Sequence, residues 1–200
     1  EHNQNVLFPP GHWGRTADGL GGGAIMSCLT HQIDALRWYA GEAEAVTCIS
    51  AVLPERMEGE TVGVVAARMR SSAVANLSIN WFTNSHIGQD DLWYEMVQAC
   101  GRRGEAYFTS NRGDLRVRLH EPLETPTDMF DAEAALERFV AVPHDNTPGH
   151  VGCIRQWVRL LRGEPADIRT SGRDCSGTVE LAEAAYRSEQ TGRVISLPLT

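Results

Sequence analysis

A hydroxyl, an imidazole, a carboxylate and an indole recur at helical spacing in one stretch of the chain. The separations are four, three and four residues, so a helix would align four side chains on one side: Ser27, His31, Asp34 and Trp38. These groups donate and accept hydrogen bonds, and an imidazole also titrates near neutral pH. The spacing is typical of one wall of a site, and equally of a solvated helix face that includes one histidine.

The element that must carry these side chains is a helix within residues 21–41. A second stripe of the same stretch is apolar and recurs at spacings of four, four, three and four: Ile25, Leu29, Ile33, Leu36 and Ala40. We expect this stripe to be buried. Glycines precede the stretch, and Gly41 follows it at the position where helices commonly end in a left-handed conformation.

The glycines before this helix formally match a dinucleotide-binding fingerprint, G-x-G-x-x-A, over residues 19–24. That fingerprint has meaning only directly after an apolar strand. The preceding residues 12–18 (HWGRTAD) are not such a strand. We therefore expect the glycines to permit a tight turn and a close backbone approach, and not to hold a cofactor.

The middle of the chain is predicted to consist of strands joined by short turns. Apolar and β-branched runs lie at 45–53, 61–69, 74–82, 92–99, 105–109, 115–120 and 139–142. Consecutive strands with short connections favour an antiparallel sheet. Helices are predicted from residue 151 to Gly163 and from Ser171, as its cap, to about residue 190, with a closing strand at 194–198.

These elements predict the α+β class, with a largely antiparallel sheet and helices packed on one face. Residues 1–20 show no periodicity and are expected to form an irregular surface segment. In this segment, Trp13 and Arg15 are candidates for contact with a ligand, although simple packing and solvation would also explain them. The other sheet face would meet solvent or another subunit.

Composition narrows the function classes. The 200 residues are 42% hydrophobic and 22% charged, shares that are ordinary for a globular protein. The net charge of −8 does not favour nucleic acid or an anionic membrane as a partner. No apolar run approaches the roughly 20 residues of a membrane span, and no signal peptide is visible. Five scattered cysteines suggest neither a disulfide framework nor a metal site, so we expect a cytoplasmic protein.

Two long motifs resemble those of a known family. The stretch GGGAIMSCLTHQIDALRWYAG resembles the signature that opens the second domain of Gfo/Idh/MocA oxidoreductases. The ending GHVGCIRQWVRLLRGEPADIRTSGRDCSGTVELAEAAYRSEQTGRVISLPL is similar to the C-terminal signature of that family. The resemblance implies a dihydrodipicolinate-reductase-like second domain, with residues 1–200 forming one substrate-binding and oligomerisation domain.

The resemblance also implies an activity. Family members join this domain to an N-terminal Rossmann domain that binds NAD or NADP. In these enzymes a hydride passes between the nicotinamide and a carbinol carbon of a sugar, inositol or nucleotide-sugar. No Rossmann unit is present in this sequence, and the catalytic lysine of the family, in Glu-Lys-Pro, belongs to that other domain. A homo-oligomer formed through the open sheet face is expected.

Site residues follow from the same resemblance. His31 matches the family histidine near the reacting hydroxyl, which transfers a proton or orients substrate. Ser27 stands where many members have an aspartate, and it cannot supply the charge that would make the histidine more basic. His150 matches a histidine of nucleotide-sugar dehydrogenases. With Trp13 and Arg15, Ser27 and His150 are the expected substrate contacts.

Two other functions remain open at this stage. Some relatives use tightly held NAD to assist elimination or glycoside cleavage, without net cofactor reduction. A non-catalytic binding or assembly subunit could also retain the fold, and Ser27 in place of the aspartate favours that possibility.

Overall fold

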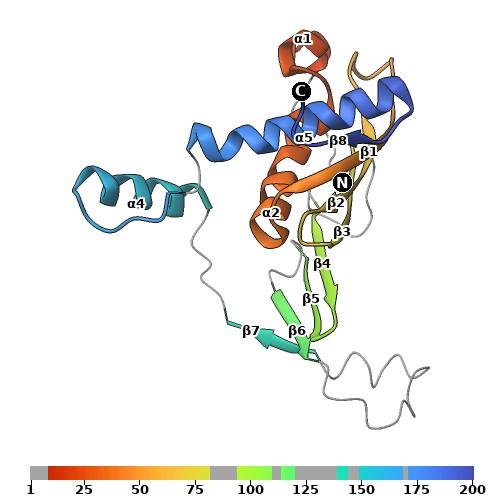
Figure 1. The fold of residues 1–200 in the computed structure, drawn as a ribbon. Helices are drawn as coiled ribbons and strands as arrows, with labels where there is room; N and C mark the ends of the chain where they lie inside the picture. The colour runs from red at the N-terminus through yellow and green to blue at the C-terminus, as the bar shows by residue number, and fades with distance from the viewer. Residues whose placement is uncertain (1–8, 82–93, 110–113, 120–138, 144–148, 169–170) are drawn as a thin grey trace. The chain divides into compact units, whose positions relative to one another are not determined.

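A computed structural model divides the chain into two compact units, Glu1–Asn84 with Pro148–Thr200, and Ser85–Thr147 (Figure 1). The residues that it describes are 9–81, 94–109, 114–119, 139–143, 149–168 and 171–200. Each unit contains one antiparallel sheet. The predicted α+β class is confirmed, but the strands form two sheets, and the described residues show no pairing that would join them.

The first unit is built on a sheet with the strand order β3-β2-β1-β8. Its strands are β1 (Ala43–Ala51), β2 (Val62–Met69), β3 (Val74–Asn80) and β8 (Ile195–Ser196). Neighbouring strands are antiparallel throughout. Burial alternates along β1 and β2, because successive side chains of a strand point to opposite faces. One face therefore supplies the core and the other remains exposed.

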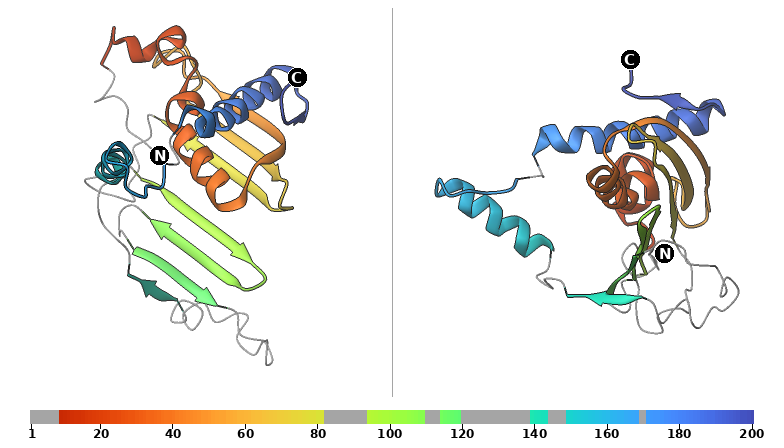
Figure 2. Two further views of the ribbon diagram at one scale, coloured as in Figure 1. Left: turned by 60° about the vertical axis from the view of Figure 1, so that its left-hand side comes forward. Right: turned by 60° about the horizontal axis from the view of Figure 1, so that its bottom comes forward.

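Two long helices lie on the core face of this sheet (Figure 2). The first is α2 (Thr30–Ala40), which a π-helical turn, η2 (Ile25–Leu29), precedes. The predicted stripe is buried at Ile25, Leu29 and Ile33 and half-buried at its last two members. The second helix, α5 (Gly172–Thr191), is capped by the Ser171 side chain, as predicted, and is followed by Gly192 in the left-handed conformation.

Part of the segment that was expected to be irregular is helical. A 3₁₀ turn, η1 (Trp13–Arg15), leads into the short helix α1 (Ala17–Leu20). The Thr16 side chain accepts a hydrogen bond from the Gly19 amide and so caps α1, while Gly21 ends it in the left-handed conformation. These helical pieces are too short for a periodic pattern to predict them, and residues 1–8 lie outside the described part of the chain.

The helix predicted after Gly149 is present as α4 (Gly149–Leu161). Its apolar stripe is less buried than the pattern suggests, because Ile154 is 61% and Leu161 is 83% exposed. Among the described residues, no helix is both long and apolar enough to cross a membrane.

The second unit is a sheet with the order β4-β5-β6-β7. Its strands are β4 (Met96–Gly101), β5 (Gly104–Thr109), β6 (Asp114–Leu119) and β7 (Val140–Val142). The register places apolar residues opposite one another on one face, in the rows Val97, Phe108, Leu115, Val142 and Ala99, Ala106, Val117, Val140. The other face is polar and contains an ion pair between Glu105 and Arg118.

Candidate functional site

His31 is exposed near the beginning of α2, on the helix that the sequence predicted to carry the site. Within the described residues it makes no hydrogen bond and no ion pair. Its neighbour two residues earlier, Leu29, is buried in the core, so the helix is held from its opposite side. An imidazole held on a packed helix and open to solvent can exchange a proton with a bound hydroxyl.

Ser27 lies in the π-helical turn immediately before α2 and is half-buried. Its hydroxyl lies 3.9 Å from the Cys28 sulfur. The wider π-helical turn separates Ser27 from the regular α-helical spacing that the sequence pattern assumed, and such turns are frequent at functional sites.

The other two members of the polar stripe differ from each other. Asp34 accepts a hydrogen bond from the Thr178 hydroxyl at 2.8 Å and lies 3.7 Å from Arg37, so its carboxylate connects α2 to α5. Trp38 is 63% exposed and stacks on Tyr39 with ring centroids 5.6 Å apart. Asp34 therefore has a structural role, whereas Trp38 presents an aromatic surface.

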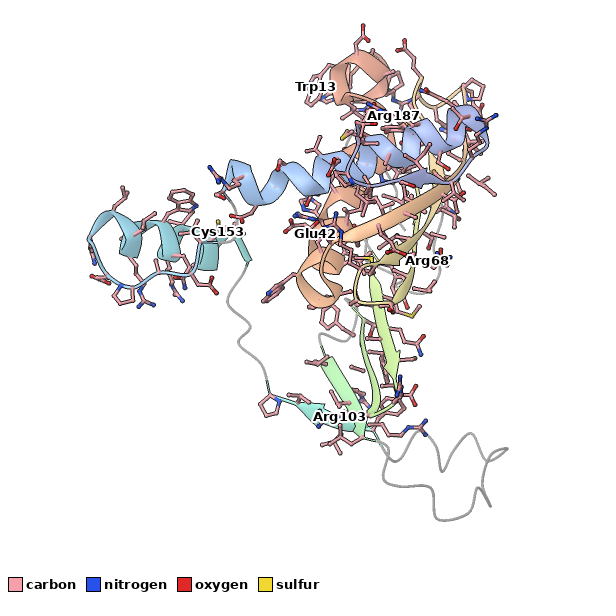
Figure 3. The ribbon with its side chains drawn as sticks, in the orientation of Figure 1. Trp13, Glu42, Arg68, Arg103, Cys153 and Arg187 are labelled. Carbon is pink, nitrogen blue, oxygen red and sulfur yellow. The ribbon has the colours of Figure 1, made fainter. Side chains whose placement is uncertain are left out.

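Trp13 and Arg15 occupy the turn η1, outside the helix α2. Figure 3 shows Trp13. Trp13 is 61% exposed, and its ring lies 5.2 Å from that of His12. The Arg15 guanidinium donates to the Arg56 carbonyl oxygen at 3.0 Å, and the Arg15 carbonyl accepts from the Glu58 amide. These bonds fasten the turn to the loop that precedes β2.

His150, the second residue of α4, is exposed and makes no hydrogen bond within the described part of the chain. The structure thus brings Ser27 and His31 onto consecutive turns of one helical segment. Trp13 and Arg15 come from the preceding turn, and His150 comes from a separate helix.

Two residues that the sequence analysis did not select determine where the helical segment begins. Glu60, which is only 7% exposed, and the half-buried Tyr186 accept hydrogen bonds from the amides of four consecutive residues: Gly23, Ala24, Ile25 and Met26. The Tyr186 hydroxyl in turn donates to Glu60 Oε1 at 2.9 Å. An isolated acid between Gly59 and Thr61 and a tyrosine on a distant helix carry no local signal of this pairing.

The same contacts test the glycine motif as a cofactor site. A dinucleotide diphosphate needs free amides at the beginning of a helix that follows a strand. Here the amides of residues 23–26 already bond to Glu60 and Tyr186, and the short helix α1 precedes the glycines in place of a strand. The described residues therefore do not fit the diphosphate of NAD at this motif.

In the part of the chain that the structure describes, neither a metal centre nor the cavity beside α2 coincides with His31. No group of His, Cys, Asp and Glu among the described residues could hold a metal ion. A cavity of about 490 Å³ lies beside the second half of α2, and its walls include Asp34, Arg37 and Trp38 but not His31. Among the described residues, the candidate site is thus an exposed face of α2.

Comparison with known proteins identifies the family. Residues 1–106 match the GFO/IDH/MocA C-terminal domain, a match that includes η1, the π-helical turn, α2 and the first three strands. The chain belongs to this family.

Curated and solved GFO/IDH/MocA relatives are about twice as long as this chain. A D-apiose dehydrogenase of Rhizobium rhizogenes is 24% identical over 169 residues, which are 84% of this chain and 46% of that protein. The D-apiose dehydrogenase of Paraburkholderia graminis is 25% identical over 84% of this chain and 43% of its own length. The chain thus spans about half the length of the curated relatives that it matches.

A solved structure shares the fold over the whole chain. The WlbA dehydrogenase of Bordetella pertussis, crystallised with NADH and UDP-GlcNAcA, superposes with a TM-score of 0.70 at 22% identity, covering 100% of this chain and 52% of WlbA. Within the residues that match this domain, helix α2 carries a histidine at position 31, and the π-helical turn before it carries a serine at position 27.

Proposed function

We propose that this chain is the substrate-binding and oligomerisation domain of an NAD(P)-dependent oxidoreductase that acts on a hydroxyl of a sugar, inositol or nucleotide-sugar. The observation that carries the proposal is the family match over residues 1–106, because it includes the whole helix on which His31 stands exposed. The D-apiose dehydrogenases, which match 84% of the chain, support a carbohydrate substrate.

His31 is the proposed catalytic residue. When a carbinol is oxidised to a carbonyl, its hydroxyl proton must pass to a base, and an exposed imidazole can accept it. We assign Trp13, Arg15, Ser27 and His150 to substrate contact. The nicotinamide cofactor, which serves as hydride acceptor, is assigned to the Rossmann half found in family members, since the glycine motif of this chain does not fit it.

Ser27 favours a second candidate function, a binding or assembly subunit without turnover. A serine hydroxyl near Cys28 offers no charge to stabilise an imidazolium on the next turn, whereas an aspartate would. Such a subunit would bind the sugar and leave it unchanged. A relative that uses NAD for elimination would instead form product without net NADH.

Oligomerisation is proposed through the open face of the first sheet. On this face Ile49 of β1 is 78% exposed and pairs directly with Val64 of β2, which is 43% exposed. Exposed apolar neighbours on a sheet mark a surface that another chain can cover.

The test is an assay of the full-length protein that contains this chain. Purified enzyme is incubated with NAD or NADP and a panel of neutral sugars, inositols and nucleotide-sugars, and both NAD(P)H and sugar products are followed. We expect oxidation of at least one compound of the panel, and a loss of at least about a hundredfold in kcat in His31→Gln. Full turnover in His31→Gln would contradict the catalytic role, and sugar binding without any product would favour the second candidate.

A further inference from the structure

The first four amides of a helix have no acceptor within the helix and need partners elsewhere. At the beginning of the His31 helix, two of these partners are supplied by a single tyrosine hydroxyl. Tyr186, from α5, accepts from the Gly23 amide and from the Met26 amide, each at 3.2 Å. The first bond within the helix follows immediately, from the Ser27 amide to the Gly23 carbonyl at 3.0 Å.

Glu60 supplies the other two acceptors. Its Oε1 accepts from the Ile25 amide at 2.8 Å, and its main-chain carbonyl accepts from the Ala24 amide at 2.8 Å. Ala24, at the N-cap position of the π-helical turn, has no capping side chain of its own. The beginning of this helix is therefore defined entirely by two residues that are distant in sequence.

The contact leaves no room for side chains at the glycines. A Cβ on Gly22 would collide with the Tyr186 hydroxyl, and one on Gly23 would collide with the Glu60 main chain. A Cβ on Gly59 would likewise collide with the Gly22 carbonyl. The glycines are thus needed because this segment packs closely against Glu60 and Tyr186 of the same chain.

Charge also favours this arrangement. A carboxylate at the N-terminal end of a helix is stabilised by the helix dipole and by the amides it accepts from. Burial raises the pKa of the Tyr186 hydroxyl, and the neighbouring Glu60 carboxylate raises it further. The tyrosine consequently remains protonated at physiological pH and keeps donating to Glu60.

We propose that Tyr186 and Glu60 are positioning residues for the candidate site. By fixing where the helix begins, they set the placement of Ser27 and of the His31 imidazole. His31 follows Met26 by five positions, or about 7.5 Å along a helix axis at about 1.5 Å per residue, so a shift at the first turn reaches the imidazole. As a statement about catalysis, this inference rests on the proposed function.

The experiment compares Tyr186→Phe with Tyr39→Phe in the full-length protein. Tyr186→Phe removes only the hydroxyl that joins Gly23, Met26 and Glu60, whereas Tyr39 is 67% exposed and is a matched surface control. Three quantities are measured well below the unfolding temperature: kcat, KM, and the ring-proton NMR shifts of His31. Glu60→Gln, which keeps an oxygen for the Ile25 amide, is compared with Glu60→Ala.

We expect Tyr186→Phe to lower kcat at least about tenfold, with KM within about twofold, and to move the His31 ring signals. Tyr39→Phe should change none of these, and Glu60→Gln should retain more activity than Glu60→Ala. A lower unfolding temperature with unchanged kcat and unchanged His31 signals would overturn the proposal. If the wild type oxidises no sugar, the proposed function fails. Displaced His31 signals in Tyr186→Phe would then still support the positioning role of Tyr186. Undisplaced signals would overturn the positioning role as well as the proposed function.

Discussion

Arg37 and Glu42 form a two-point ion pair at the end of α2, in which Nε and Nη2 donate to the two carboxylate oxygens at 3.0 and 2.7 Å. Arg37 Nη1 also donates to the Asp174 carbonyl at 2.7 Å, which lies in the first turn of α5. The hydrogen bond from Arg37 lowers the pKa of the Glu42 carboxyl. One guanidinium thus connects α2, the residue before β1, and α5.

This pair predicts an acid-sensitive contribution to stability. Because the pKa of Glu42 is lower in the folded state, its contribution is complete above the unfolded pKa of about 4.3 and is lost as the pH falls through the folded value. Glu42→Gln should lower the free energy of unfolding by about 0.5–1 kcal/mol near neutral pH and by much less near pH ~3. Urea unfolding at both pH values measures this. Glu44→Gln is the control, since Glu44 lies 3.8 Å from an exposed Arg68.

Substitution of Thr178 tests the connection between α2 and α5. Its side chain is 6% exposed, donates to Asp34 at 2.8 Å and accepts from Arg37 at 2.8 Å. Valine keeps the shape but leaves both partners without this hydroxyl, so Thr178→Val should lower the free energy of unfolding by about 1–3 kcal/mol. Thr191→Val, which removes an exposed hydroxyl bonded to the Arg187 carbonyl, should cost little. Equal losses in the two variants would contradict the role given to Thr178.

The elements with local signals were predictable from the sequence. The stripe through Ile25, Leu29 and Ile33, the cap at Ser171 and the glycine at position 192 all depend on neighbours within a few residues. The division into two sheets was not predictable in this way, because strand pairing joins residues whose separation in sequence does not reveal which strands meet.

The candidate site shows the same limit. His31 could be proposed from its helical spacing and from the motif around it, but Glu60 lies 35 residues from Ile25 and Tyr186 lies 163 residues from Gly23. Only tertiary packing brings them together, so no spacing rule could indicate them. No local pattern in the sequence indicates what the glycines contact.

Substitution of Gly23 tests whether this glycine is required for close packing or only for the turn. Gly23→Ala places a Cβ against the Glu60 backbone, which cannot move aside as a flexible side chain can. We expect a loss of about 2–4 kcal/mol in the free energy of unfolding. Gly152→Ala, inside α4 with open space around its Cβ position, should be neutral or gain up to about 1 kcal/mol. Chemical denaturation of both variants would decide, and a tolerated Gly23→Ala would refute the close contact.

Ser27→Asp tests whether a charge four residues before His31 affects the protonation of its imidazole. A carboxylate at position 27 favours the protonated imidazole, so His31 should stay protonated to higher pH in Ser27→Asp than in Ser27→Asn. Ser27→Asn is the matched control, since it has the same shape without the charge. NMR titration of the His31 ring measures both variants. Equal titration curves would show that Ser27 does not face His31 across the π-helical turn.

If copies of the chain associate through the open face of the first sheet, a single charged residue on this face should weaken the association. Ile49 is 78% exposed and lies beside Val64 on the face opposite the core. Burying an isolated lysine against apolar neighbours is costly, so Ile49→Lys should shift the wild-type oligomer toward smaller species without lowering the unfolding temperature of the monomer. Val194→Lys, at a 65% exposed position outside the strands, should leave the association unchanged. Sedimentation velocity over a range of concentrations measures both, and a wild type that sediments as a monomer, or an Ile49→Lys variant that still associates fully, would exclude this face as the interface.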